Sequence, residues 1–371
     1  MCIRDSRFPV MPRRLVGAGG GGWGRWARFV LRRPLATAVA GLAVIAVLAG
    51  IGTQIRTAEA PLANFPGAGT AIEGRDALAA AGITPGAMKP IDVLVERGGD
   101  AAEVASRLRE VPGIVGASVI WRDGPDAMVE ALPAIDGAAP GIEAILHRSA
   151  TALRGTDATV TGLAAVDRDF LDVLSARIPW ILALVLGLTM LLLMRAFRSI
   201  VLPLKAVALN LLSLAAAFGV VVLVFQYGYG SSLWDVPAAD SVTAWVPIMI
   251  FAFLFGLSMD YEVFMLGAMR EAYDETGSTD RAIELGLART GKLVTSAALI
   301  LMFAFLVLST SPGYEIKPLA IGIAAGIVID ATIIRALLVP ALMRLMGDAN
   351  WWLPRRPAWL SRKPVVATRG A

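Results

Sequence analysis

Carboxyl side chains lie inside the most apolar runs of this sequence. Asp260 and Glu262 flank Tyr261 in the run FGLSMDYEVFML, and Asp330 lies within AIGIAAGIVIDATII. A charge at the centre of a membrane-spanning helix costs at least about 2.5 kcal/mol on insertion scales, so such residues usually have a function. A carboxyl group that binds and releases a proton inside the membrane would serve as a proton relay. We therefore predict that Asp260, Tyr261 and Asp330 form a relay, with Glu262 in support.

Glycines precede both aspartates by four residues. Gly256 comes before Asp260, and Gly326 comes before Asp330. Positions four apart share one face of an α-helix, and small residues on such a face let neighbouring helices approach closely. We therefore expect both aspartates to face closely packed helices.

Hydroxyl groups are available to hold these carboxyl groups. Thr295 and Ser296 lie at the cytoplasmic end of another apolar run, where they could hydrogen-bond a carboxyl group on a neighbouring helix. Tyr261 can donate or accept a hydrogen bond and could pass a proton onward. We expect these three residues to contact the aspartates.

Structural roles are the alternative for the same residues. Asp260 could be a neutral, hydrogen-bonded packing residue, or its helix could end early and leave Asp260 and Glu262 at the membrane interface. Asp330 could pair with Arg335 or Thr332 and stabilise helix packing only. The sequence leaves these alternatives open.

The composition excludes an ordinary soluble protein. Of the 371 residues, 56% are hydrophobic and 17% are charged, against roughly 25% charged in soluble domains. The net charge of +4 is too small to indicate a nucleic-acid-binding surface. With one cysteine (Cys2) and one histidine (His147), far apart in the chain, we expect no metal site and no intramolecular disulfide.

Six apolar runs are long enough to approach the roughly 20 residues of a spanning helix. They occupy 35–52, 178–194, 199–227, 245–266, 293–308 and 318–343. Lys and Arg concentrate in the connections near 195–205, 270–292 and 344–363, whereas 228–244 and 309–317 contain one basic residue, Lys317. Because basic loops stay in the cytoplasm, we predict that both termini are cytoplasmic.

The polar stretch 55–177 is predicted to form an extracytoplasmic domain. Predicted strands at 91–96, 114–120, 127–134 and 158–161 alternate with predicted helices at 101–109 and 141–153. This βαββαβ order is that of the ferredoxin-like arrangement. A further helix at 166–177 should continue directly into the second span.

The chain accordingly divides into five parts and is expected to be an α-helical polytopic membrane protein with an α+β domain outside. The parts are a basic, glycine-rich cytoplasmic segment (1–33), a first span (34–54), the extracytoplasmic domain (55–177), a five-helix bundle (178–346) with a cytoplasmic amphipathic segment (268–290), and a cytoplasmic tail (347–371). We interpret residues 1–6, MCIRDS, as a translated sequencing-adapter remnant.

Three stretches carry a resemblance to a known family. They are FGLSMDYEVFML, EAYDETGSTDRAIELGLARTGKLVTSAALIL and IVIDATIIRALLVPALMRLMGDANWWLP. Together they resemble the mycobacterial membrane protein large (MMPL) family, a branch of the resistance-nodulation-division transporters. The resemblance is strong over 245–354 and looser over the rest of the chain.

The resemblance implies a function in a bacterial cytoplasmic membrane. Members of the family export lipids or other hydrophobic molecules, with the proton gradient as energy source and no cofactor. By position, Asp260 and Tyr261 match the family's Asp-Tyr pair, Glu262 matches the acidic residue that follows it, and Asp330 matches the aspartate of the last span. No phosphate-binding glycine loop with its lysine is present, which argues against ATP as the energy source.

The resemblance also implies that half of a transporter is present. Family members have two six-span halves, each with a porter domain, whereas one half is found here. We expect a fragment that lacks its N-terminal six-span half, or a half-sized transporter that forms a homodimer. The alternative function is a non-transporting membrane receptor or assembly scaffold with a sterol-sensing-like bundle. We expect no nucleic-acid partner.

Overall fold

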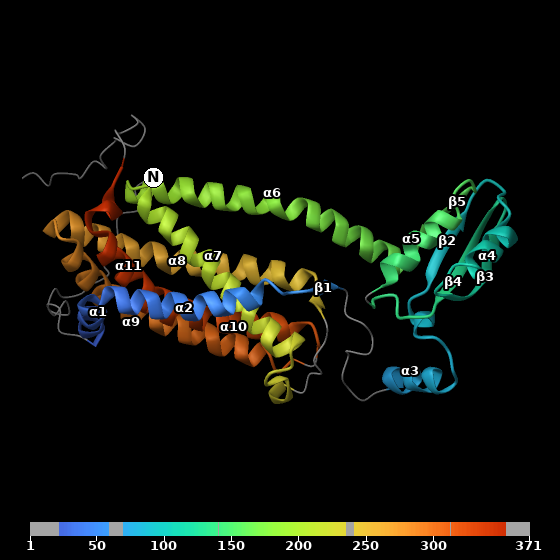
Figure 1. The fold of residues 1–371 in the computed structure, drawn as a ribbon, viewed down its shortest axis with the longest axis horizontal. Helices are drawn as coiled ribbons and strands as arrows, with labels where there is room; N and C mark the ends of the chain where they lie inside the picture. Colours follow the sequence, from blue (N-terminus) through green and yellow to red (C-terminus); the bar gives the residue numbers. More distant parts are fainter. Residues whose placement is uncertain (1–21, 59–69, 140, 235–240, 312, 354–371) are drawn as a thin grey trace, which may run out of the picture.

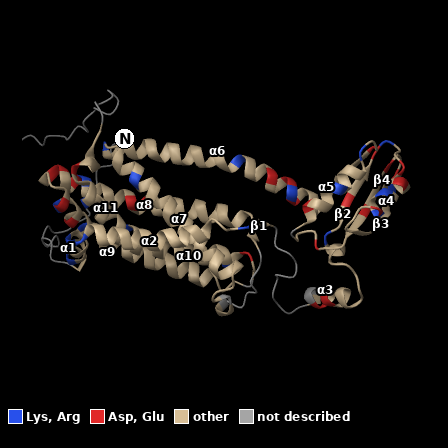
Figure 2. Cartoon of the chain, in the orientation of Figure 1, with Lys and Arg blue, Asp and Glu red and all other residues tan. Residues whose placement is uncertain are grey.

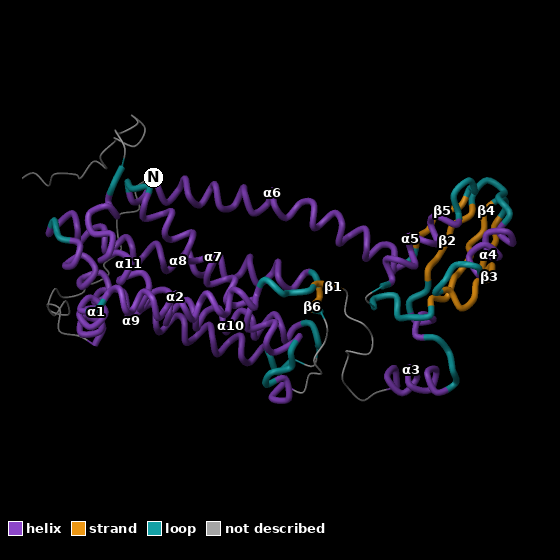
Figure 3. Tube along the Cα trace, in the orientation of Figure 1, coloured by secondary structure: helices purple, strands orange, loops and turns teal. Residues whose placement is uncertain are grey.

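Helices form an elongated bundle, and a smaller unit of strands and helices lies at one end of it (Figures 1 and 3). The computed structural model describes residues 22–58, 70–139, 141–234, 241–311 and 313–353. The expectations for residues 1–6 and for 354–371 lie outside these ranges.

Among the described residues, six helical segments are long and apolar enough to cross a membrane. They are α2 (Pro34–Gly52), α6 (Leu163–Phe197), α7 with η4 (Val201–Gln226), α8 (Trp245–Thr276), α9 (Thr279–Leu308), and the continuous helix α10–η6–α11–η7 (Ile316–Trp351). Each contains one of the six predicted spans almost entirely. The chain is therefore a multi-pass membrane protein.

The last of these segments changes its helical type along its length. It begins as the α-helix α10 (Ile316–Ile329), continues as the π-helix η6 (Asp330–Leu338) and the α-helix α11 (Val339–Met346), and ends in the 3-10 turn η7 (Gly347–Trp351). Similarly, α7 (Val201–Val221) continues into the π-helix η4 (Val222–Gln226). Residues 347–351 were expected in a tail, but Asn350 and Trp351 are buried against the bundle.

Glycine permits a close helix crossing in the bundle, that of α2 with α7. A Cβ atom built on Gly52 would overlap the carbonyl oxygen of Ala215, and one built on Gly219 would overlap that of Leu48. Because a side chain at either position would meet backbone, only glycine fits without moving a helix.

The predicted amphipathic segment 268–290 belongs to the ends of two long helices. Helix α8 ends at Gly277, which has a left-handed conformation with φ of 65°, as glycine readily adopts. Ser278 then caps α9, because its side chain accepts a hydrogen bond from the backbone N–H of Arg281. The segment is therefore divided at Gly277 and Ser278 into the end of α8 and the start of α9.

The α/β unit has the element order β2–α4–β3–β4–α5–β5. Its strands are β2 (Ile91–Val95), β3 (Ile114–Asp123), β4 (Asp126–Pro133) and β5 (Ala158–Thr161), and its helices are α4 (Ala101–Arg109) and α5 (Ile142–Ala152). The four strands form an antiparallel sheet in the order β3-β4-β2-β5. Alternate residues of β2 (Ile91, Val93 and Val95) are buried with apolar residues of α4 and α5, as a half-covered sheet requires.

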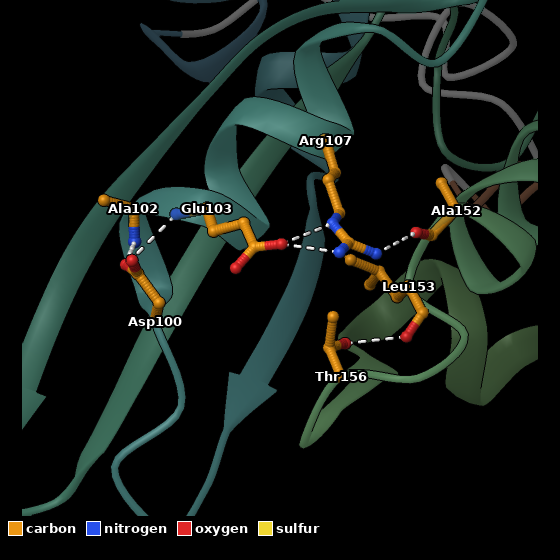
Figure 4. Close-up of polar contacts among 7 residues, drawn as sticks. All are labelled: Asp100, Ala102, Glu103, Arg107, Ala152, Leu153 and Thr156. Atoms are coloured by element: carbon orange, nitrogen blue, oxygen red, sulfur yellow. Dashed lines mark hydrogen bonds and ion pairs between the residues drawn. The ribbon is translucent and has the colours of Figure 1, made fainter.

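Polar contacts hold α4 in place and connect it to α5 (Figure 4). The Asp100 carboxylate accepts hydrogen bonds from the backbone N–H groups of Ala102 and Glu103 at 2.9 and 3.2 Å, which caps the helix. Arg107 pairs with Glu103 one turn earlier and donates to the carbonyl of Ala152 at 3.4 Å. The two helices are thus fixed on the same side of the sheet.

Two connections join the α/β unit to the bundle. Helix α6 runs unbroken from the unit into the membrane segment, as expected from the sequence (Figure 1). On the other side, β1 (Thr57–Ala58) follows α2 and pairs in parallel with β6 (Val242–Thr243), which precedes α8. The remaining elements are α3 (Thr70–Ala80), η3 (Pro85–Met88) and η5 (Ser231–Trp234).

A helix that the sequence analysis did not predict lies before the first span. Helix α1 (Gly22–Arg32) packs against α9 and α11. Its glycines led us to expect only a glycine-rich segment. The Trp23 side chain occupies the space beside Gly291 on α9, where an added Cβ would lie 2.5 Å from the indole ring.

Candidate functional site

Three polar side chains form a buried, hydrogen-bonded cluster between α8 and η6. Ser258 Oγ donates to Asp330 Oδ2 at 2.9 Å, and Arg335 Nε donates to the same oxygen at 2.8 Å. Arg335 Nη2 also donates to Ser258 Oγ at 2.8 Å and to the Ser258 carbonyl. All three residues are at most 4% exposed. The cluster is therefore an ion pair enclosed by protein.

The π-helical geometry of η6 brings Asp330 and Arg335 together. An α-helix turns by about 100° per residue, so residues five apart lie about 140° from each other around its axis. A π-helix, with its wider turn, places such residues near the same face, and π-helical turns occur frequently at functional sites. The sequence alternative in which Asp330 pairs with Arg335 is the one observed, and Thr332 instead donates to the Val328 carbonyl.

Helix α1 completes the hydrogen bonding of η6. Pro340 has no backbone N–H, so the carbonyl of Ala336 lacks the donor that an α-helix would place four residues later. Trp26 Nε1 on α1 donates to this carbonyl at 2.9 Å. The segment that carries Arg335 is thereby attached to a helix outside the six spans.

Tyr261 contacts the cluster through its ring. The Arg335 guanidinium carbon lies 4.7 Å from the centre of the Tyr261 ring, a favourable cation–π distance. The expected hydrogen bond from Tyr261 to a carboxyl group is absent, because Tyr261 Oη has no hydrogen-bond partner among the described residues. Asp330 Oδ1 and Arg335 Nη1 also lack one within that part of the chain. Buried polar atoms of this kind are rare and are a feature of functional sites.

Asp260 does not join this cluster. It is exposed on the outer face of α8, next to Tyr261 in the chain. Gly256, one turn earlier, is also exposed, and a Cβ atom built there has no atom within 4 Å. The expectation that Asp260 faces a closely packed helix is therefore wrong among the described residues.

Gly326 behaves as the sequence predicts. A Cβ atom built on Gly326 would overlap the Leu254 side chain, so the glycine lets α10 approach α8 closely. This approach places Asp330, four residues later, within reach of Ser258.

Thr295 and Ser296 do not hold a carboxyl group. Thr295 Oγ1 donates to the Gly291 carbonyl on its own helix at 2.8 Å, as threonine commonly does in a helix. Ser296 is exposed. The prediction for these two residues is wrong, because a position on the right helix does not fix the direction of a side chain.

A second buried polar group lies near Glu262. Glu262 is 3% exposed, so it is enclosed by protein, unlike a carboxylate at a membrane interface. It interacts electrostatically with Lys205 on α7 and with Arg335. Lys205 Nζ donates to Asn350 Oδ1 at 2.8 Å, and Ser199 Oγ donates to the Asn350 carbonyl at 2.6 Å.

The sequence analysis missed four residues of these clusters: Ser199, Lys205, Ser258 and Asn350. Lys205 had a visible signal, since it lies inside the apolar run VLPLKAVALNLL, but we used it only to orient the chain. Ser258 lies four residues before Glu262, on the same helix face. Asn350 had no signal, because its role depends on the return of the chain end to α7.

Six apolar helices around a buried ion pair define a polytopic membrane protein with a charged site inside its helix bundle. The family profile described as "MMPL family" matches residues 127–367. This is more than half of the chain, so the chain belongs to the MMPL family.

Relatives in this family carry names that describe transport. The chain is 34% identical over 355 residues to "Heme uptake protein MmpL11" of Mycobacterium tuberculosis, which covers 91% of this chain and 36% of that protein. It is 33% identical to "Mycolic acid-containing lipids exporter MmpL11" of Mycolicibacterium smegmatis, over 97% of this chain and 39% of that protein. It is 38% identical to "Trehalose monomycolate exporter MmpL3" of M. tuberculosis, over 56% of this chain and 22% of that protein. The chain thus spans less than half the length of these relatives.

Proposed function

We propose that this chain forms one half of a proton-driven exporter of lipids or other hydrophobic molecules. Membership of the MMPL family and the names of two relatives as lipid exporters support the substrate class. The observation that carries the proton coupling is the buried Asp330–Arg335 pair, with unpaired atoms on both partners. The proton gradient is the energy source, and no cofactor and no enzymatic step are involved.

Protonation of Asp330 would change the contact between α8 and η6. In the ionised state the carboxylate holds Arg335, and both contact Ser258 on α8. A neutral Asp330 would leave the Arg335 charge buried and uncompensated, which is strongly unfavourable. Arg335 would then move toward another acceptor, and the buried carboxyl group of Glu262, which interacts electrostatically with Arg335, is a candidate. Proton uptake would thus become a shift between two helices.

Asp260 and Tyr261 would receive protons from a second six-span unit. Asp260 lies on an exposed face of α8 beside an uncovered Gly256, and a lipid-facing carboxylate in a span is costly. We propose that an N-terminal half or a second copy of the chain covers this face. Asp260 would then be the main proton acceptor, with Tyr261 between it and the Asp330 cluster.

The α/β unit would act as a ferredoxin-like porter domain outside the membrane. The element order and strand order support this assignment. Helix α6 would transmit helix movement to the domain, since it is continuous between them. The chain would lie in a bacterial cytoplasmic membrane with both termini in the cytoplasm.

Substitutions in membrane vesicles that contain the intact transporter test the relay. Asp260→Asn, Tyr261→Phe and Asp330→Asn should each reduce transport of a fluorescent lipid driven by a pH gradient by at least about tenfold. Ser296→Ala, an exposed change on α9, is the matched control. Unchanged transport in Asp260→Asn, with normal membrane insertion, would end the relay assignment.

A non-transporting scaffold is the second candidate, and the exposed position of Asp260 outside the Asp330 cluster favours it. In that case Asp330→Asn would lower stability without altering any proton-dependent flux.

The same vesicles loaded with heme in place of lipid would test the substrate class indicated by the name of the M. tuberculosis relative.

A further inference from the structure

Helix α1 is fixed to the bundle along one side. Trp26 donates to the Ala336 carbonyl, Arg28 forms an ion pair with Glu284 on α9, and Arg344 on α11 donates to the Leu31 carbonyl. These contacts reach two different helices of the bundle. The position of α1 relative to the first span is therefore set by tertiary contacts.

A groove lies at the elbow between α1 and α2, and its volume is about 440 Å³. Helix α1 contributes a large aromatic ring and the cation of Arg32, the connecting residue Arg33 contributes a second cation, and α2 contributes small side chains. The Phe29 side chain is 60% exposed. The residues that line the groove are Phe29, Arg32, Arg33, Ala36, Thr37 and Ala40.

The cations of this groove have no carboxylate partner among the described residues. Arg28 and Arg344 form ion pairs, whereas Arg32 and Arg33 form none with any residue that the structure describes. Figure 2 shows the basic residues gathered on α1. An anion from outside the described chain is therefore the complementary occupant.

The ends of this chain are unsuited to that role. Residues 1–21 contain four arginines and one aspartate, and 354–371 contain five basic residues and no acidic one. Either segment would add positive charge next to Arg32 and Arg33. Charge complementarity thus favours a separate anionic molecule.

The groove lies at the depth of lipid headgroups. Arg33 directly precedes Pro34, the first residue of a 19-residue apolar helix, whose length of about 28 Å matches the hydrocarbon core of a bilayer. The Thr37 hydroxyl donates within its own helix, to the carbonyls of Arg33 and Pro34. The floor that continues into the membrane is then apolar, with Ala36 and Ala40 one turn apart.

We propose that this elbow binds an anionic phospholipid. The phosphate lies between Arg32 and Arg33, because a guanidinium group binds phosphate oxygens in pairs. One acyl chain lies along Ala36 and Ala40, where small side chains leave room. The lipid attaches α1 to the first span and so stabilises the contact of Trp26 with η6. The site does not depend on proton coupling.

Native mass spectrometry of the detergent-purified full chain tests the site. The probes are phosphatidylglycerol and phosphatidylcholine with identical acyl chains, and we expect the wild type to prefer phosphatidylglycerol. The double variant Arg32→Gln/Arg33→Gln should weaken phosphatidylglycerol binding roughly 30-fold, since each basic residue near a lipid surface contributes about a factor of five. Arg25→Gln/Lys292→Gln removes two exposed charges outside the groove and should change binding less than about threefold.

A second variant separates a built groove from simple charge attraction. Ala40→Phe fills the floor and keeps both arginines, so it should also weaken binding of phosphatidylglycerol. If Ala40→Phe binds as the wild type does, or if both double variants lose affinity equally, the proposal is wrong. Displacement of the lipid by inorganic phosphate at equal concentration would also overturn it, because a free anion would then suffice.

Discussion

At the scale of single residues, burial makes the partner of each charge decisive. The carboxylate of Asp330 and the guanidinium of Arg335 are both enclosed by protein and are held together at 2.8 Å. Removing one member of a buried pair leaves the other uncompensated, which costs more than removing both. The effect of a substitution at this site on stability therefore depends on whether the remaining charge keeps its partner.

Arg335→Gln should therefore destabilise the protein more than the double variant Asp330→Asn/Arg335→Gln. We expect a loss of about 3–5 kcal/mol for the single change, because it leaves the Asp330 carboxylate buried without its cation. Thermal unfolding in detergent measures the difference, with Arg75→Gln at an exposed ion pair as control. Equal losses in the single and double variants would contradict the pairing argument.

Asp92 on β2 provides a pH-dependent case outside the six apolar helices. Burial raises the pKa of Asp92 above its ordinary value of 3.8, and Glu130 is its cross-strand neighbour. A raised pKa in the folded state means that full stability is present below about pH 4 and falls as the pH rises through the folded-state pKa. Asp92→Asn should remove this penalty.

The α/β unit with Asp92→Asn should thus be more stable than the wild type at pH 7 and equally stable near pH 3.5. Hydrogen exchange of peptides from 91–133, corrected for intrinsic rates, measures the local stability in the full chain. Asp169→Asn, at an exposed site on α6, should have no effect at either pH. A stabilisation that persists unchanged at the lower pH would exclude ionisation of Asp92 as the cause.

At the scale of elements, glycines decide which helices approach one another. Gly326 and Gly322 on α10 both face α8. A Cβ atom added to Gly326 would meet the Leu254 side chain, and one added to Gly322 would lie 2.6 Å from the Ile250 side chain. Gly256 on α8 shares the same sequence spacing to an aspartate but faces open space. Two glycines with identical patterns therefore have different structural roles.

Gly326→Ala should separate α10 from α8 and lower stability by about 1–3 kcal/mol, as overpacking commonly does. Gly256→Ala is the matched control and should be neutral or slightly stabilising, since alanine favours a helix more than glycine. Thermal unfolding of the isolated chain in detergent compares the two variants. The same loss for both would show that the contacts of Gly326 do not set this approach.

At the scale of the whole molecule, the distribution of charge predicts the orientation of the bundle in the membrane. The segments 195–205 and 270–292 carry most of the loop arginines and lysines, whereas 228–234 carries none. Because translocation of basic loops is disfavoured, the α/β unit should lie on the side opposite to Gly277, the turn between α8 and α9.

Single cysteines at Ser232 and Ser278, in a chain with Cys2→Ser, should react with a membrane-impermeant maleimide from opposite sides. In intact cells Ser232→Cys should be labelled, and Ser278→Cys only after permeabilisation. Labelling of both before permeabilisation would refute the topology. Both positions lie in connections between spans, so the substitutions should leave the bundle intact.

The sequence by itself determined the six spans and the order of elements in 91–161. Hydrophobic periodicity, glycine and capping residues are local signals, and each acts within a few residues of the chain. The sequence also identified Asp330 and Glu262 as unusual, because the cost of a charge among apolar residues depends on composition alone.

Only the tertiary structure decided what these residues contact. The pairing of Asp330 with Ser258, the approach of Asn350 to Lys205, and the outward direction of Asp260 depend on how distant helices pack. Helix α1 was missed for the same reason, since its glycine-rich start becomes helical where Trp23 and Trp26 bind the bundle. The helical periodicity of the sequence defines the faces of each helix, but the packing of the complete bundle determines which residues each face contacts.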